Sequence, residues 1–253
     1  MKTSVLGSFG AAALLAITVS GCGGAAAPRA ADASSAPSAA TETTTATPTP
    51  KPIPTPSATA YTADGLAAIV GQVRDAADRR LSVLSRADVA SSLQQAKAAI
   101  ASMHVAPAEC QEIAASSNFS AFEGAAMAAG QSIDTGTGSM AVMTLAAGLD
   151  ESILATIASQ LDQLDACANV TMTAGGMDYA VTLTPVEGAG SVPDTVAYRT
   201  DIKSSDGKLQ STIKAQAVHH GVLMTAVAVG GGSEADAVRR AGALMDSAAA
   251  LVK

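Results

Sequence analysis

Two adjacent histidines have the residue type and the spacing that could support metal binding or pH sensing. His219 and His220 lie side by side in a chain that has only three histidines among 253 residues. Neighbours on a strand point to opposite faces of a sheet, so this pair is not expected to share a metal ion. A turn between two strands is the favoured interpretation, with a metal-binding or pH-sensing role as the alternative.

Two pairs of carboxylates have the i, i+3 spacing that places side chains together on a helix. They are Asp162 with Asp165 and Glu109 with Glu112. Such a pair could hold a cation, but a solvated helix face explains it without any ligand. The sequence therefore predicts no metal site and no cofactor.

Serine and lysine recur at a spacing known from serine enzymes. Residues 211–214 (S-T-I-K) match the S-T-x-K box of penicillin-binding proteins, and residues 205–208 (S-D-G-K) match its looser form. In those enzymes the serine opens a helix and a Lys-Thr-Gly box completes the site. Here both matches lie on a predicted hairpin and that box is absent, so Ser211 and Lys214 are not expected to be catalytic.

Glycine and methionine form two further patterns that have structural explanations. Residues 230–232 are glycines before a predicted helix, a place where phosphates can bind. Glu234 and Asp236 already supply the negative charge that this helix end favours, so a capping turn is expected. Of the nine methionines only Met140 and Met143 lie close together, and methionine is a natural gap filler in a core with few aromatic residues.

Residues 19–22 (V-S-G-C) resemble a bacterial lipobox. A basic start and the apolar residues 5–19 precede them, and this run is too short for a permanent membrane-spanning helix. The resemblance to bacterial lipoprotein signals implies cleavage between Gly21 and Cys22 and lipid on the Cys22 sulfur. We therefore expect residues 1–21 to be a signal peptide and the mature chain to be lipid-anchored at the extracytoplasmic face of the cell membrane. An ordinary secretory signal is the alternative.

Composition limits the partners of the chain. Aromatic residues make up 2% of it, with no Trp, and the formal net charge is −7. Sugar-binding and single-stranded nucleic-acid sites usually rely on aromatic surfaces, and an acidic surface repels phosphate backbones. We therefore expect no nucleic-acid partner, and attachment to the membrane through the covalent lipid alone.

Residues 22–60 are predicted to be a disordered tether, because they are rich in Ala, Ser, Thr and Pro and have almost nothing to bury. Alternate prolines in residues 48–56 favour a semi-rigid polyproline II stalk. The Thr-rich residues 41–49 either carry O-linked sugar or remain unmodified. Residues 61–253 are predicted to form a single extracytoplasmic domain.

Hydrophobic periodicity predicts the elements of this domain. Helical spacing predicts helices at residues 62–73, 85–103, 110–115, 150–167 and 233–252. Alternation predicts strands at residues 124–131, 139–145, 177–183, 196–202, 209–215 and 222–229. The last strand is apolar on both faces and is therefore expected to be central. The order indicates an α+β fold in which helices pack on an antiparallel sheet of about six strands.

Several short segments in this order resemble a known family. They are L-S-R-A-D-V at residues 84–89, P-A-E-C at residues 107–110, D-A-C at residues 165–167 and G-V-L-M-T-A-V at residues 221–227. Over roughly residues 81–253 the layout is similar to the extracellular sensor domain of the mycobacterial kinase PknH and to related actinobacterial lipoproteins. The resemblance implies a sensing or ligand-binding module without catalysis of its own.

Cys110 and Cys167 are the only cysteines left if Cys22 carries lipid. An even pair of cysteines in an exported chain is expected to be oxidised. The sequence therefore predicts one disulfide between them, and two separate buried thiols are the alternative.

These observations together predict a lipid-anchored cell-envelope lipoprotein whose domain is not an enzyme. Its expected ligand is a small apolar molecule, an envelope component or another protein. One alternative is an envelope hydrolase, which would need a serine or aspartate beside His104, His219 or His220. A second alternative is a structural assembly partner.

Overall fold

The structure, a computed structural model, describes residues 61–111, 122, 124–158 and 166–253. The predicted signal peptide, Cys22 and the tether lie outside the described residues. Glu112 and the pair Asp162 and Asp165 also lie outside them. Within the described part of the chain, no helix combines the length and the apolar character that crossing a membrane requires.

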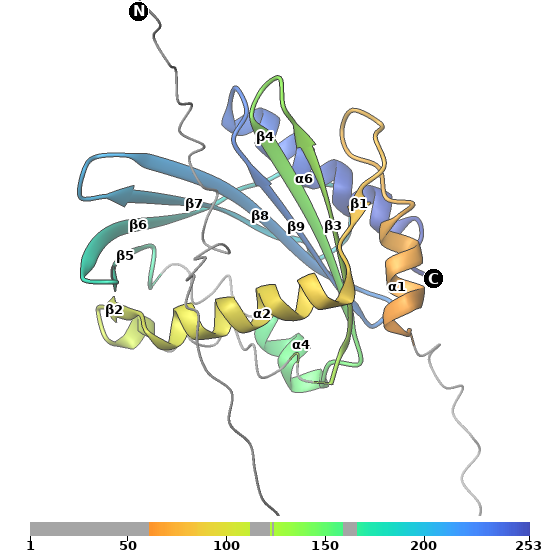
Figure 1. The fold of residues 1–253 in the computed structure, drawn as a ribbon, viewed down its shortest axis with the longest axis horizontal. Coiled ribbons are helices and arrows are strands. Elements are labelled where there is room, and N and C mark those ends of the chain that lie inside the picture. The colour runs from red at the N-terminus through yellow and green to blue at the C-terminus, as the bar shows by residue number, and fades with distance from the viewer. Residues whose placement is uncertain (1–60, 112–121, 123, 159–165) are drawn as a thin grey trace, which may run out of the picture. The chain divides into compact units, whose positions relative to one another are not determined.

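The domain is an α+β fold with one antiparallel sheet, as predicted. Its elements are α1 (Ala63–Val70), β1 (Ser82–Val83), α2 (Arg86–Ala101), β2 (His104–Ala106), β3 (Ala126–Asp134), β4 (Ser139–Ala147), α4 (Glu151–Ala158), β5 (Asn169–Ala174), β6 (Met177–Pro185), β7 (Val196–Ser204), β8 (Leu209–His219), β9 (Val222–Val229) and α6 (Glu234–Ala249). The strands lie in the order β1-β3-β4-β9-β8-β7-β6-β5-β2 (Figure 1).

The prediction of about six strands is wrong, because the described residues form a sheet of nine strands. The strands that were not counted are β1, β2 and β5. Two of them have only two and three residues, too few to show any periodicity. The third, β5, has the sequence N-V-T-M-T-A, in which apolar residues alternate with threonine. Only two residues separate it from β6, so the two alternating runs look like one in the sequence. The prediction that residues 222–229 are central is confirmed, since β9 pairs with both β4 and β8.

Side-chain caps set the starts of three helices where the sequence predicted them. Thr62, Ser85 and Ser233 each accept a hydrogen bond from the backbone N–H three residues later. Such caps satisfy N–H groups that have no partner inside the helix. The first helix is shorter than predicted because it ends at Gly71, although Val73 beyond it is fully buried.

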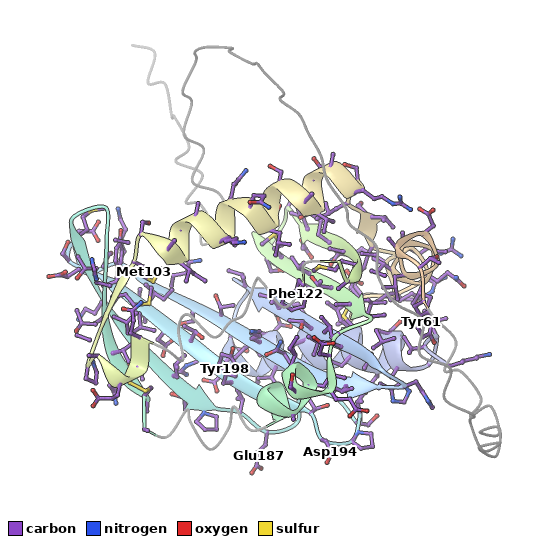
Figure 2. All side chains as sticks on the ribbon, turned by 90° about the horizontal axis from the view of Figure 1, so that it is seen from below. Tyr61, Met103, Phe122, Glu187, Asp194 and Tyr198 are labelled. Carbon is purple, nitrogen blue, oxygen red and sulfur yellow. A yellow bond between two sulfur atoms is a disulfide. The ribbon has the colours of Figure 1, made fainter. Side chains whose placement is uncertain are left out.

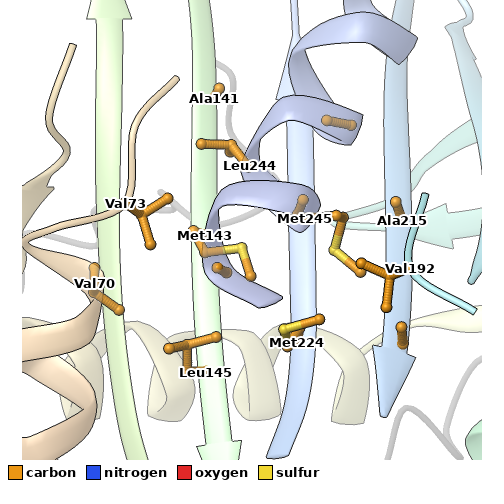
Figure 3. Close-up of a cluster of buried hydrophobic side chains, with 14 of the residues drawn as sticks. Val70, Val73, Ala141, Met143, Leu145, Val192, Ala215, Met224, Leu244 and Met245 are labelled. Atoms are coloured by element: carbon orange, nitrogen blue, oxygen red, sulfur yellow. The ribbon is translucent and has the colours of Figure 1, made fainter. Parts of the chain in front are cut away.

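One face of the sheet, here called the core face, packs against α1 and α6. Met143, Leu145, Met224, Leu244 and Met245 are completely buried there. Figure 3 shows this cluster between α6 and the strands beneath it. Three of the five are methionines, which fill a core that lacks large aromatic residues.

The opposite face, here called the α2 face, is crossed by α2 alone among the long described helices. This helix follows β1 and leads into β2, which are the two edge strands, so it runs from one edge of the sheet to the other. It lies on the side of the strands opposite α6 (Figures 1 and 3). Ala96 is the only buried residue of α2, whereas α6 buries seven, so α2 packs against its face far less closely than α6 packs against the core face.

A second, smaller cluster lies at the β2 edge of the sheet and contains the disulfide. Cys110 and Cys167 are bonded, with their Cα atoms 5.8 Å apart, and the predicted disulfide is confirmed. Both are buried beside Val105, and Met103 and Val170 pack against them. Figure 2 labels Met103. Cys110 lies in the helical turn after β2, and Cys167 lies two residues before the start of β5. The bond therefore joins these two segments.

Candidate functional site

The structure separates the residues of the apparent S-T-x-K box. Ser211 and Lys214 are three positions apart on β8 and therefore point to opposite faces. The Ser211 hydroxyl donates to Asp201 Oδ1 at 2.5 Å on the core face. The Lys214 ammonium lies 5.7 Å from the centre of the Tyr198 ring on the α2 face. This serine and this lysine therefore cannot act as a nucleophile and its base.

The two neighbouring histidines form the predicted turn, but the expectation that their side chains diverge is wrong. Their ring centres are 4.2 Å apart and the rings meet edge to face. The cause is the backbone of His220, whose φ of 48° turns its side chain back towards His219. In the described segments no three His, Cys, Asp or Glu side chains gather closely enough to hold a metal ion. No described histidine forms a hydrogen bond with a described serine or aspartate.

The glycine-rich turn before α6 is a capping turn, as predicted. Gly230 and Gly231 have φ values of 66° and 99°, which favour glycine. Arg240 donates to the Gly230 carbonyl oxygen, and Ser233 caps the helix. Glu234, in the first turn of α6, pairs with Arg199.

Among the described residues, two cavities lie on or beside the core face. The larger, of about 870 Å³, opens between the β7–β8 hairpin and the start of α6. Hydrogen bonds with Glu234 and then Asp201 raise the pKa of Arg199, the main cation of this cavity. The smaller, of about 720 Å³, lies between α6 and the loop after β6, where Asp246 Oδ1 accepts two hydrogen bonds from Ser191. Arg199 and Asp246 are thus engaged within the chain, although Arg199 Nε has no hydrogen-bond partner and Glu187, which lines the smaller cavity, has no ion pair among the described residues.

The α2 face differs from the core face within the same strands. On β4 and β9, core-face residues such as Met143 and Met224 are fully buried. On the other face of these strands Ala146 and Leu223 are also buried, but Thr144, Thr225 and their neighbours Val142 and Val227 are only half-buried. Alternation of side chains along each strand makes this a difference between two faces. The α2 face is thus neither packed like a core nor open like a surface.

Strand register brings a set of polar side chains together at the middle of the α2 face. Thr144 lies opposite Thr225, and Thr225 lies opposite Gln216. In the adjoining row Lys214 lies opposite Tyr198. We call these five residues the Gln216 cluster. They come from the four adjacent strands β4, β9, β8 and β7.

Gln216 is the most buried polar member of the cluster, with only 6% of its surface exposed. Its Nε2 donates to Thr225 Oγ1 at 3.0 Å, but its Oε1 is buried without any hydrogen-bond partner. The positions of the amide oxygen and nitrogen could be exchanged, because the Thr225 hydroxyl can donate as well as accept. Oε1 would then have a hydrogen-bond partner and Nε2 would have none. A buried polar group without a hydrogen-bond partner destabilises the folded protein by about 1 to 3 kcal/mol. A ligand that supplies the missing partner removes this destabilisation.

Lys214 is the charged member of the cluster and lies two residues from Gln216 on the same strand. It is half-buried, and no described carboxylate forms an ion pair with it. Among the described strand residues that face α2 it is the only charged one, because Asp134 and Asp201 belong to the core face. The strands of the α2 face therefore present one positive charge beside one amide group that lacks a hydrogen-bond partner.

Gln216 was not predicted from the sequence to be a site residue, although its strand carries a recognisable pattern. Strand β8 carries Thr212, Lys214 and Gln216 on one face and Ile213 and Ala215 on the other. Such alternation is typical of a strand with one solvent-exposed face. Only the position of β8, inside the sheet and beneath α2, shows that Gln216 is instead buried.

Comparisons with known proteins give a likeness in structure but none in sequence. No protein-family model matches this chain, and no curated protein matches it in sequence. The crystal structure of the extracellular domain of PknH from Mycobacterium tuberculosis is similar with a TM-score of 0.42 and 19% identity. The match covers 58% of this chain and 77% of that one. We therefore base the proposed function on the residues of this chain itself.

Proposed function

We propose that this chain is a lipid-anchored lipoprotein of the cell envelope whose domain binds a small molecule on the α2 face and has no catalytic activity of its own. The observation that carries the proposal is the buried amide of Gln216, which lacks a partner. Buried polar groups in folded proteins nearly always have hydrogen-bond partners, so a group that has none within the chain needs one from a ligand or a water molecule. Binding of a ligand would satisfy this group and cover the half-buried residues around it.

The surroundings of Gln216 support binding rather than catalysis. Threonine hydroxyls, one amide, one ammonium and one phenol orient a ligand by hydrogen bonds and charge, in the way typical of small-molecule sites. No described carboxylate or histidine adjoins Lys214 or Gln216 to act as a general base. The apolar residues Val142 and Val227, in the row of Lys214, offer contact area for the body of a ligand.

The binding part of the proposal is tested by native mass spectrometry of the full chain purified from its own host. A retained small molecule on the wild type is expected, and Gln216→Met should lose it, because methionine keeps the volume and removes both polar groups. Gln210→Met is the matched control, on the same strand and the same face but outside the cluster. Equal retention by the wild type and Gln216→Met, or no retained molecule in either, would contradict the proposal.

Gln216→Met also has an expected effect on stability. Removing an unmet buried polar group should raise the midpoint of thermal unfolding of the ligand-free chain, whereas the Gln210→Met control should leave it nearly unchanged. A loss of ligand together with a gain of stability would distinguish a binding residue from a structural one.

The anchor is tested separately, at Cys22. Cys22→Ala should abolish lipidation and leave the signal uncleaved, because lipoprotein signal peptidase acts on the lipidated form. Phase partitioning in detergent with intact-mass measurement checks both effects. A Cys22→Ala chain of mature length that still enters the detergent phase would contradict the lipobox interpretation without bearing on the α2 face.

A further inference from the structure

Charge on the α2 face identifies the kind of ligand group that Lys214 can accept. Lys214 is half-buried, and the one partner of its ammonium among the described residues is the Tyr198 ring. The strand carboxylates closest in sequence, such as Asp201, lie on the other face and pair there with Arg199. No described carboxylate meets this charge, so an anionic group of a ligand is the partner that Lys214 can accept.

The spacing of the cluster adds a second requirement. Lys214 and Gln216 are two residues apart on one strand, so their Cα atoms lie about 7 Å from each other on the same face. The long lysine side chain can bring its ammonium towards Gln216 Oε1. A ligand that meets both groups needs an anionic group and, within a few atoms of it, an N–H or O–H donor.

Apolar residues next to the polar pair add a third requirement. Val227 lies beside Lys214 across the β8–β9 pairing, and Val142 lies beside Val227 on β4. An alkyl body extending from the polar end of the ligand would lie along these residues.

We infer that the ligand is a small amphipathic carboxylate with an N–H or O–H donor next to the carboxylate group. The carboxylate pairs with Lys214, the donor serves Gln216 Oε1, and the apolar body contacts Val142 and Val227. This inference rests on the proposed function, because it specifies the ligand of the same site. No covalent step is involved.

N-hexanoylglycine is a suitable probe because it has all three features. Two relatives each lack one of them: its methyl ester has no charge, and N-hexanoylsarcosine has no N–H. Isothermal titration of the full chain should show N-hexanoylglycine binding most tightly. The ester should bind about tenfold or more weakly, since a charge-assisted contact is lost, and the sarcosine derivative several-fold more weakly.

Matched variants assign each requirement to a residue. Lys214→Met should weaken N-hexanoylglycine about tenfold while leaving the affinity for the ester unchanged, and Lys214→Arg should retain most of the binding. Lys203→Met is the control, because Lys203 is exposed on β7 and points to the core-face side. Gln216→Met should remove the preference for N-hexanoylglycine over the sarcosine derivative.

The outcomes separate this inference from the proposed function. If the ester binds as tightly as the acid, or Lys214→Met binds the acid as well as the wild type does, the carboxylate inference is wrong. The proposed function survives that result if Gln216→Met still releases the molecule retained from the host. Absence of N-hexanoylglycine binding to the wild type would overturn the inference as well, and absence of any retained molecule would overturn both.

Discussion

Arg240 of α6 offers the sharpest test of how the glycine turn is held to the sheet. Its side chain is 10% exposed, and its Nε donates to Asp236 Oδ2 at 3.0 Å. Its terminal nitrogens donate to the carbonyl oxygens of Met140 and Val229, at 3.0 Å and 3.3 Å, and of Gly230. One guanidinium thus joins the start of β4, the end of β9 and the first turn of α6.

Arg240→Ala removes every one of these donors and leaves one carboxylate and three carbonyl oxygens without them. Hydrogen bonds to charged groups contribute about 1.5 to 3 kcal/mol each, and breaking a buried charged pair costs about 3 to 5 kcal/mol. Because these contributions are not additive, we expect a loss of about 3 to 5 kcal/mol. At about 2 to 4 degrees per kcal/mol, the melting temperature should fall by roughly 6 to 20 degrees.

Chemical denaturation and calorimetry measure this loss, and two variants control for it. Arg239→Ala removes the neighbouring arginine, which is 60% exposed and also bonds Asp236, and should cost less than about 1 kcal/mol. Arg240→Lys keeps the charge but not the planar fork, so it should recover only part of the loss. Equal losses for Arg240→Ala and Arg239→Ala, or full recovery with Arg240→Lys, would refute the reasoning.

Three further predictions concern close packing, acid stability and the disulfide. Gly242→Ala should lower the melting temperature although alanine favours helices, because the new Cβ would lie 2.6 Å from the Gly190 backbone nitrogen; a rise would contradict it. Burial raises the pKa of Asp75, but hydrogen bonds donated within its own loop outweigh this and lower it overall. Its folded pKa therefore lies below the unfolded one, so its stabilising effect is complete above about pH 4 and is lost as the pH falls through the folded pKa. Denaturation curves should therefore show a stability difference between wild type and Asp75→Asn that shrinks as the pH falls below about 4. A difference that does not change with pH would argue against this. Replacing Cys110 and Cys167 by serine should cost about 4 kcal/mol, since the bond closes a loop of 57 residues, and unchanged melting would contradict that value.

Side-chain periodicity and capping residues were enough to predict most of the described elements. The alternation of β6 to β9 and the turn at Asp206 and Gly207 follow from the local sequence. The serine caps of α2 and α6 are equally local, because the side chain bonds a backbone group three residues away. These features depend on neighbours in the chain, so a single sequence contains them.

The rest depends on contacts between distant segments. Strands β1 and β2 exist because β3 and β5 offer them free edges, and nothing in two or three residues records that pairing. The contact between the rings of His219 and His220 depends on a backbone angle that the sequence leaves open. The disulfide was predictable only because two cysteines remained and the chain was expected to be exported.

The candidate site shows why the alternation of polar and apolar residues along a strand cannot by itself distinguish a solvent-exposed face from a proposed binding face. On β8 the even-numbered residues Thr212, Lys214 and Gln216 have the composition of a surface, and a strand at the edge of a sheet would expose them. In this fold β8 is paired on both sides and α2 passes over the same face, yet Gln216 acquires no second hydrogen-bond partner. A folding requirement alone would favour an apolar residue there, as at Ala215 and Ala217 on the other face. The polar residue is therefore better explained by a ligand that completes its hydrogen bonds than by the stability of the sheet.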